Sequence, residues 1–185
     1  MKIFPLNKET HTDNAEVGGK CLSLLQLIQL GMVVPDAFVI TTSAYEEHAI
    51  RCGLNERIFP LVKEQDWAGV ERTAHEILND CPIDEDMSRM LLDHYSRLEN
   101  TVVAVRSSAT SEDQKGASSA GQYESYLNIH GEGDLLLAVR KCWASLWSRR
   151  ALVYRQRRGI DQFSARMAVI IQEMVPADSA GVLFT

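Results

Sequence analysis

The spacing of apolar residues predicts a long helix near the start of the chain. Polar side chains recur at Ser23, Gln26 and Gln29, and leucine or isoleucine fills most other positions between 19 and 30. A polar stripe as narrow as this one predicts a helix that is mostly buried. Gly31 is a suitable end for it, because glycine readily adopts the left-handed backbone that closes many helices.

A block of further helices is predicted over residues 43–99. Asp66 precedes one apolar pattern of helical spacing and is its expected cap, and a second such pattern begins at Met87. A buried strand is expected before the block, at 37–40, and another after it, at 101–105. The block is therefore expected to be an insertion between strands.

The chain beyond residue 100 mixes strand and helix patterns. The expected elements are strands at 101–105, 123–129 and 167–175, a helix over 132–157, and a last strand that begins at 179. These patterns predict an α+β fold, with a mixed or antiparallel sheet and flanking helices. The last strand reaches Thr185 without a polar tail, so the natural protein is expected to be longer.

Composition and charge narrow the class of protein. The 185 residues carry a net charge of −6, and 45% of them are hydrophobic, as is usual for a globular domain. An acidic chain is not expected to bind nucleic acid or an anionic membrane through bulk charge. The sequence has no apolar run that approaches the ~20 residues of a membrane span, and its first residues lack the apolar core of a signal peptide.

A basic run stands out against this acidic background. Tryptophan and tyrosine residues lie near the arginines at positions 149, 150, 155, 157 and 158. Basic and aromatic residues interleave in this way on some nucleic-acid-binding surfaces. The helical spacing and the acidity of the chain favour the other interpretation, a solvated face paired with acidic side chains.

The cysteines and histidines suggest neither a metal centre nor a disulfide framework. Cys21, Cys52, Cys81 and Cys142 form no CxxC pair, and the five histidines show no ligand spacing. Three of the cysteines lie among apolar helical positions, where reduced and buried thiols are common. We therefore expect free thiols, a cytoplasmic location and no metal site within the chain.

Two segments far apart in the sequence are suited to bind phosphate. The first is Gly18-Gly19-Lys20, which stands where the first helix is expected to begin. Glycines let the backbone approach a ligand closely, and the first turn of a helix offers unpaired N–H groups and a partial positive charge. The alternative is an ordinary turn with a solvated lysine, because the spacing is not that of a Walker A loop.

Arg106 provides the second cation. It follows the strand at 101–105, so it is expected at the carboxyl end of that strand, where open sheets place their ligands. Its guanidinium can hold two phosphate oxygens at once, and the alternative is an ion pair with Glu112 or Asp113. Residues 107–122 are mostly small or polar and are expected to form a loop that covers the phosphates.

Gln172 lies at the end of another apolar strand. Residues 169–171 precede it, and Pro176 follows four positions later. A strand that ends in a proline hinge would suit the edge of an adenine base, whereas the alternative is a simple exit from strand to turn.

Six collinear segments resemble the N-terminal nucleotide-binding domain of the phosphoenolpyruvate synthase (pyruvate, water dikinase) family, which pyruvate phosphate dikinase and rifampin phosphotransferase share. They are VGGK at 17–20, VPDAFVITTSAY at 34–45, VAVRSSATSED at 103–113, SSAGQYESYLNI at 118–129, CWASLW at 142–147 and IIQEMVPADSAGVLFT at 170–185. The resemblance covers nearly all of the chain and is weakest over 53–100.

The resemblance implies a role for several residues. Residues 1–185 would be the N-terminal portion of an ATP-grasp domain, with the remainder of the enzyme absent. Lys20 and Arg106 would hold the phosphates of ATP, Gly121 and Ser125 would lie along the phosphate-covering loop, and Gln172 would lie near the adenine and ribose. Mg²⁺ is the second implied cofactor, but the acidic ligands that hold it in the family lie beyond residue 185.

The resemblance also implies a reaction. In the family, a phosphoryl group passes from ATP to a histidine on a separate swivelling domain, and from there to pyruvate or another small molecule. The chain is thus expected to be the ATP-binding portion of a longer transferase and to be inactive alone, with the phosphohistidine domain as its partner.

Two other functions stay open at this point. One is a rifampin-type antibiotic phosphotransferase, and the other is a non-catalytic nucleotide-binding or interaction module. An exposed sheet edge could also allow the chain to form a dimer.

Overall fold

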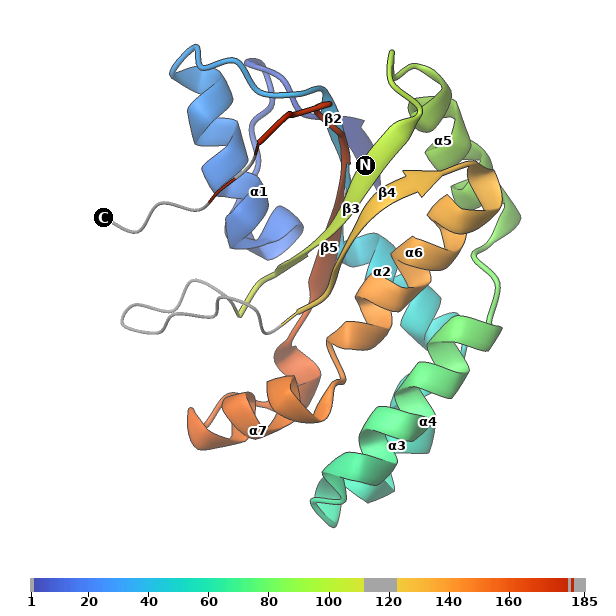
Figure 1. The fold of residues 1–185 in the computed structure, drawn as a ribbon. Coiled ribbons are helices and arrows are strands. Elements are labelled where there is room, and N and C mark those ends of the chain that lie inside the picture. The colour runs from blue at the N-terminus through green and yellow to red at the C-terminus, as the bar shows by residue number, and fades with distance from the viewer. Residues whose placement is uncertain (1, 112–122, 180, 182–185) are drawn as a thin grey trace.

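The computed structural model describes residues 2–111, 123–179 and 181. Its centre is an open sheet in which all neighbouring strands are antiparallel. In spatial order the strands are β1 (Ile3–Pro5), β2 (Ala37–Ile40), β5 (Met167–Glu173), β3 (Val102–Ala109) and β4 (Ser125–His130) (Figure 1). The sequence-based prediction of an α+β fold with an antiparallel sheet is confirmed.

Helices flank the sheet on both sides. They are α1 (Asn14–Gln29), α2 (Thr42–Arg51), α3 (Leu54–Lys63), α4 (Trp67–Asp80), α5 (Glu85–Ser96), α6 (Glu132–Ser145), α7 (Arg149–Arg157) and a 3₁₀ turn at Gln162–Ser164. Helix α1 covers one face, and the helical block α2–α5 lies with α6 on the other (Figure 1). The block falls between β2 and β3, as predicted.

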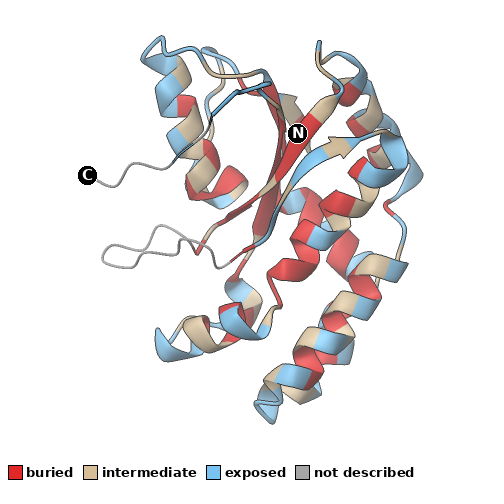
Figure 2. Cartoon of the chain, viewed as in Figure 1, coloured by how far each residue is buried: buried red, intermediate tan, exposed pale blue. Residues whose placement is uncertain are grey.

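The central strand β5 is buried on both faces, which explains its unbroken apolar sequence. Successive side chains of a strand point to opposite faces. Val169 and Ile171 accordingly join the core beneath α2 and α6, whereas Ala168 and Ile170 join a smaller core beneath α1. Figure 2 shows these buried positions running along the sheet and the inner sides of the helices.

Several predicted boundaries and burial patterns are wrong. The strand expected to end at residue 105 continues to Ala109, and the single helix expected over 132–157 is two helices. Helix α1 buries only one side, and Leu30 beyond its end is 78% exposed. The loop predicted over 107–122 and the last strand, expected from 179, fall largely outside the described residues.

One arginine of the basic run is also placed differently from the prediction. Arg155 is fully buried instead of lying on a solvated face. Its Nε donates a hydrogen bond to Gln162 Oε1 at 2.8 Å, and its guanidinium lies 5.7 Å from the centre of the Trp147 ring. Stacking on an aromatic ring is a favourable way to bury the weakly hydrated guanidinium.

Helix α1 changes direction at Gly18, which has non-helical backbone angles of φ 71° and ψ 169°. One helical turn precedes this glycine, so α1 begins at Asn14 and not at residue 19. A Cβ atom on Gly18 would lie 2.4 Å from the carbonyl oxygen of Ser108 in β3. Only glycine fits there, because any side chain would enter the backbone of the neighbouring strand.

Ser108 holds the same junction through its side chain. The N–H of Cys21 donates a hydrogen bond to Ser108 Oγ at 3.1 Å. Cys21 lies in the first turn after the bend, where backbone N–H groups have no partner within their own helix. The serine therefore caps the second part of α1 from another element, much as a local N-cap residue would.

The ends of α2 and α4 are joined by a disulfide between Cys52 and Cys81, which corrects the expectation of free thiols at these positions. Their Cα atoms are 6.1 Å apart, although 29 positions separate them in sequence. The turns between α2, α3 and α4 bring them together, and no local pattern encodes such a contact. Cys21 and Cys142 are free and buried, as expected.

His48 lies beside this disulfide within the core. Its ring packs against Trp143, with the ring centres 4.7 Å apart, and it is only 1% exposed. Burial lowers the pKa of His48 most, the positive charges of Arg51 and Arg140 add to this, and a hydrogen bond with the Leu78 backbone opposes it. Together these effects bring the pKa from 6.5 to about 4. His48 is therefore neutral near pH 7.

None of the helices in the described residues combines the length and the apolar character that crossing a bilayer requires.

We expect Gly18→Ala to lower the free energy of unfolding by about 2–6 kcal/mol, from backbone strain and overlap with Ser108 together. Gly31→Ala is the matched control. Gly31 also has a positive φ, of 79°, but nothing lies within 4 Å of its added Cβ, so it should cost only about 1–2 kcal/mol. Urea denaturation measures both, and equal losses would contradict the close contact.

We expect His48 to destabilise the fold as the pH falls from about 6.5 to about 4. In this window the unfolded chain binds a proton at His48 and the native protein does not, so the free energy of unfolding rises with pH. Below pH 4, His48 lowers the free energy of unfolding by about 3 kcal/mol relative to its value above pH 6.5. Urea denaturation at several pH values should give a smaller slope for His48→Gln, and an identical slope would refute the assignment.

Candidate functional site

Arg106 lies in the middle of β3, on the face of the sheet that α1 partly covers. The prediction that it follows the end of a strand is wrong, because β3 runs on to Ala109. The side chain is half-buried, and its Nη1 donates a hydrogen bond to Gln172 Oε1 at 2.8 Å. This contact fixes the direction of the guanidinium across the sheet towards β5.

Gln172 is held in place on the β5 side of this contact. It is 7% exposed, and its Nε2 donates a hydrogen bond to the Pro35 carbonyl at 3.4 Å. One end of the amide thus meets the backbone that leads into β2, while the other accepts from Arg106. Sequence reasoning did not find this positioning role, because the pairing joins residues 66 positions apart.

Lys20 approaches the same face from α1. It stands just after the bend at Gly18, and its Nζ donates a hydrogen bond to the carbonyl of Ser107 at 3.1 Å. The two predicted phosphate segments, 18–20 and 103–110, are therefore in direct contact. The close approach of Gly18 to Ser108 brings the lysine within reach of β3.

Ser125 completes the described part of the site. It is the direct partner of Arg106 across β3 and β4, and directly opposed residues point to the same face of a sheet. Leu127, two positions further along β4, is 59% exposed on this face, an apolar contribution that the sequence analysis did not single out. Gly121, the remaining predicted residue, lies outside the described residues.

We call Lys20, Arg106, Ser125 and Gln172 the cationic strip. They come from α1, β3, β4 and β5, and they lie on one face of the sheet. Two cations and a hydroxyl are donors suited to the oxygen atoms of a polyphosphate, and the Gln172 amide holds Arg106 in place. Glu124, the acidic residue before Ser125, faces Arg150 at 3.8 Å, an exposed pair that contributes little to stability.

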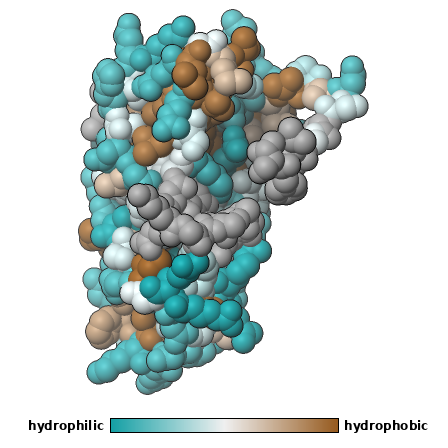
Figure 3. Space-filling model, turned by 90° about the vertical axis from the view of Figure 1, so that its left-hand side faces the viewer, coloured by the Kyte–Doolittle hydropathy of each residue, from teal (hydrophilic) through white to brown (hydrophobic). Residues whose placement is uncertain are grey.

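The surface beside the cationic strip contains an apolar region. Figure 3 views the molecule from the α1 side, and hydrophobic residues gather near one end of that face. The connection from α1 to β2 contributes three exposed apolar side chains, Leu30, Met32 and Val33. The α1 side of the molecule thus carries exposed apolar groups in addition to the two cations of the strip.

A separate cluster of metal-ligating residue types lies on the other side of the sheet. Among the described residues, His48, Cys52 and Cys81 bring three potential ligand atoms within 4.8 Å of one another. The helical block positions this cluster, so it is not part of the cationic strip.

Comparison with known proteins agrees with this geometry. Residues 14–185 match the family described as "Pyruvate phosphate dikinase, AMP/ATP-binding domain". A probable phosphoenolpyruvate synthase of Methanothermobacter thermautotrophicus is 37% identical over the whole chain, which spans 29% of that relative. The phosphoenolpyruvate synthase of Aeropyrum pernix is 40% identical over 91% of the chain, which spans 22% of it.

A relative named for a different activity is about as similar to the chain as these synthases are. The rifampicin phosphotransferase of Bacillus subtilis is 35% identical over 99% of the chain, which spans 22% of its length. The chain thus spans less than a third of the length of these curated relatives. Since the family match covers nearly all of its residues, the chain belongs to the pyruvate phosphate dikinase AMP/ATP-binding domain family.

Proposed function

We propose that the chain is the ATP-binding portion of a phosphoenolpyruvate-synthase-like phosphotransferase. The observation that carries this proposal is the convergence of Lys20 and Arg106 on one face of the sheet, in a chain that belongs to an AMP/ATP-binding family. In this role the two cations bind the phosphate oxygens of ATP. The proposal includes a cytoplasmic location.

The donor set of the cationic strip supports this assignment. Arg106 is held by Gln172 and Lys20 rests on the Ser107 carbonyl, so both cations are oriented before a ligand arrives. Phosphoryl transfer depends mainly on positioning and on neutralising negative charge, and needs little covalent chemistry from the protein. Ser125 adds a hydroxyl donor beside Arg106, and we assign Gln172 to the adenine and ribose side of the site.

Mg²⁺ is the second proposed cofactor. Among the described residues, the charged members of the strip are both positive, and Glu124 beside Ser125 is engaged with Arg150. Such groups suit phosphate oxygens but not a hard cation, which prefers carboxylate and carbonyl oxygens. We therefore assign the metal ligands to chain outside these residues; when bound, Mg-ATP supplies the phosphoryl group and the neutralising charge of the metal.

The remaining steps of the proposed reaction depend on other domains. We propose that the phosphoryl group passes to a histidine on a swivelling domain and then to pyruvate. The chain spans only 29% and 22% of the length of the two synthases, which supports the presence of such domains. The exposed edge of the sheet at β4 is a proposed surface for a dimer.

Phosphorylation of a rifamycin antibiotic is the second candidate function. The identity of 35% to a rifampicin phosphotransferase, against 37% and 40% to the two synthases described above, favours neither acceptor. A non-catalytic nucleotide-binding module is the third. Assays of the full-length protein with Mg-ATP and either pyruvate or rifampicin distinguish the first two, and ATP binding without turnover on either acceptor supports the third.

We expect Lys20→Ala and Arg106→Ala each to weaken Mg-ATP binding by about tenfold or more, since each removes a charge-assisted contact to phosphate worth about 1.5–3 kcal/mol. Isothermal titration calorimetry of the full-length protein measures the effect. Lys63→Ala and Arg89→Ala are matched controls, because both residues are exposed on the helical block.

The controls should bind as tightly as the unaltered protein. Circular dichroism would establish that all variants remain folded. Equal affinity in the unaltered protein and in both site variants would reject the phosphate-binding role of the cationic strip.

A further inference from the structure

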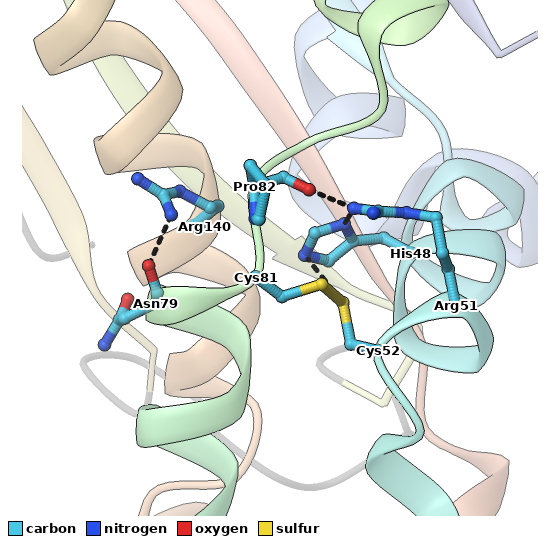
Figure 4. The surroundings of a disulfide bond; sticks show 7 residues. All are labelled: His48, Arg51, Cys52, Asn79, Cys81, Pro82 and Arg140. Atoms are coloured by element: carbon cyan, nitrogen blue, oxygen red, sulfur yellow. Dashed lines mark hydrogen bonds between the residues drawn. A yellow bond between two sulfur atoms is a disulfide. The ribbon is translucent and has the colours of Figure 1, made fainter.

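The Cys52–Cys81 disulfide joins the ends of α2 and α4 (Figure 4), in the helical block that lies on the opposite face of the sheet from α1 (Figure 1). Both cysteines are partly exposed and line a cavity of about 320 Å³ together with Arg57, Glu76 and Asp80. A small thiol or disulfide can therefore reach the sulfur atoms without unfolding of the protein.

The other two cysteines are inaccessible by comparison. Cys21 lies in the core beneath α1, and Cys142 lies in the core on the opposite face. Burial raises the pKa of both thiols, that of Cys21 to about 12. Because the thiolate is the reactive form of cysteine, oxidation should be confined to Cys52 and Cys81.

The contacts of His48 distinguish Cys52 from Cys81. Figure 4 shows the ring between the disulfide and the side chain of Arg51. Arg51 Nη2 lies 3.2 Å from His48 Nδ1, and a guanidinium can only donate hydrogen bonds. Nδ1 is therefore the acceptor, and the proton of the neutral ring is on Nε2, which faces Cys52 Sγ at 3.6 Å.

This orientation favours a reactive thiol over a metal site. A histidine nitrogen binds a metal through its lone pair, whereas here Nδ1 accepts a hydrogen bond from Arg51, and Nε2, which faces Cys52 Sγ, carries the proton. An N–H directed at Cys52 stabilises the thiolate of that residue when the disulfide is open. No comparable donor to Cys81 is found among the described residues.

Two further contacts keep the cysteines close together when the disulfide is open. Arg51 donates a hydrogen bond to the carbonyl of Pro82, and Arg140 donates one to the carbonyl of Asn79 (Figure 4). These contacts tie both sides of Cys81 to α2 and α6. The two thiols therefore stay at a high effective concentration, which favours closure of the bond.

We propose that Cys52 and Cys81 are a reversible thiol–disulfide pair, in which Cys52 is the attacking thiol and a low-molecular-weight disulfide is the oxidant. Cys52 thiolate attacks one sulfur of the oxidant, whose S–S bond breaks. One half leaves as a thiolate and takes up the proton that Cys52 lost. Cys81 thiolate then attacks Cys52 Sγ, and the second half leaves with the proton of Cys81. The protein loses two electrons, and the oxidant is reduced to two thiols.

The test begins with the reduced protein, equilibrated in glutathione buffers of increasing oxidised fraction. Acid quenching, alkylation and peptide mass spectrometry then report the state of all four cysteines in one digest. We expect Cys52 and Cys81 to become protected together in a single two-electron transition, while Cys21 and Cys142 stay reduced and serve as internal controls. We also expect the oxidised protein to melt roughly 7–14 °C above the reduced one, since a bond across 29 positions restricts the unfolded chain.

Single-cysteine variants test the order of attack. The rate of mixed-disulfide formation with glutathione should be higher for Cys52 in Cys81→Ser than for Cys81 in Cys52→Ser. The ratio should be about threefold for each unit by which the pKa of the Cys52 thiol lies below that of the Cys81 thiol. Adding His48→Leu to Cys81→Ser should lower the rate at which Cys52 forms the mixed disulfide with glutathione. His48→Gln, which keeps an N–H donor, should restore much of it.

Three results would overturn the proposal. The first is that both thiols remain alkylatable in the most oxidising buffer, and the second is a bond that does not open in the most reducing one. The third is protection of both thiols in the reduced protein by equimolar Zn²⁺ alone, which would make the cluster a metal site instead. Equal rates for the two single-cysteine variants would remove Cys52 from its role as the attacking thiol.

Discussion

The close approach of α1 to β3 is the contact on which the candidate site depends. Gly18 has no side chain, so the backbone of α1 can lie against the Ser108 carbonyl, and Ser108 Oγ accepts a hydrogen bond from the next turn of the helix. This junction sets where α1 crosses the sheet. It also brings Lys20 to the carbonyl of Ser107, so one steric constraint positions a cation that is 87 residues away from its partner in sequence.

Much of the candidate site could be predicted from the sequence because its parts are local patterns. Glycines before a helix and an arginine next to a β-branched run are local patterns that suit anion binding, and the structure brings these two segments into contact. The position of Arg106 within β3 was missed, because Ser107 and Ser108 resemble a loop in sequence. They belong to the strand because β5 pairs with both of them, which is tertiary information.

The features that sequence reasoning missed are all contacts between distant elements. The disulfide depends on how α2, α3 and α4 turn, and the burial of Arg155 depends on Trp147 and Gln162 packing around one guanidinium. Periodicity predicted that α1 is mostly buried, but a helix of many leucines buries only the side that has something to pack against. In each case the burial or bonding of the segment depends on the elements that pack against it, and its own sequence does not contain that information.

The two cations of the strip are held by different kinds of partner, and this has a consequence for divergence within the family. Lys20 rests on a main-chain carbonyl, which every amino acid at position 107 would provide. Arg106 rests on the side chain of Gln172, which a single codon change can remove. A substitution at position 172 would thus release the guanidinium of Arg106, while the contact of Lys20 with the Ser107 backbone and the junction between helix and sheet stay in place.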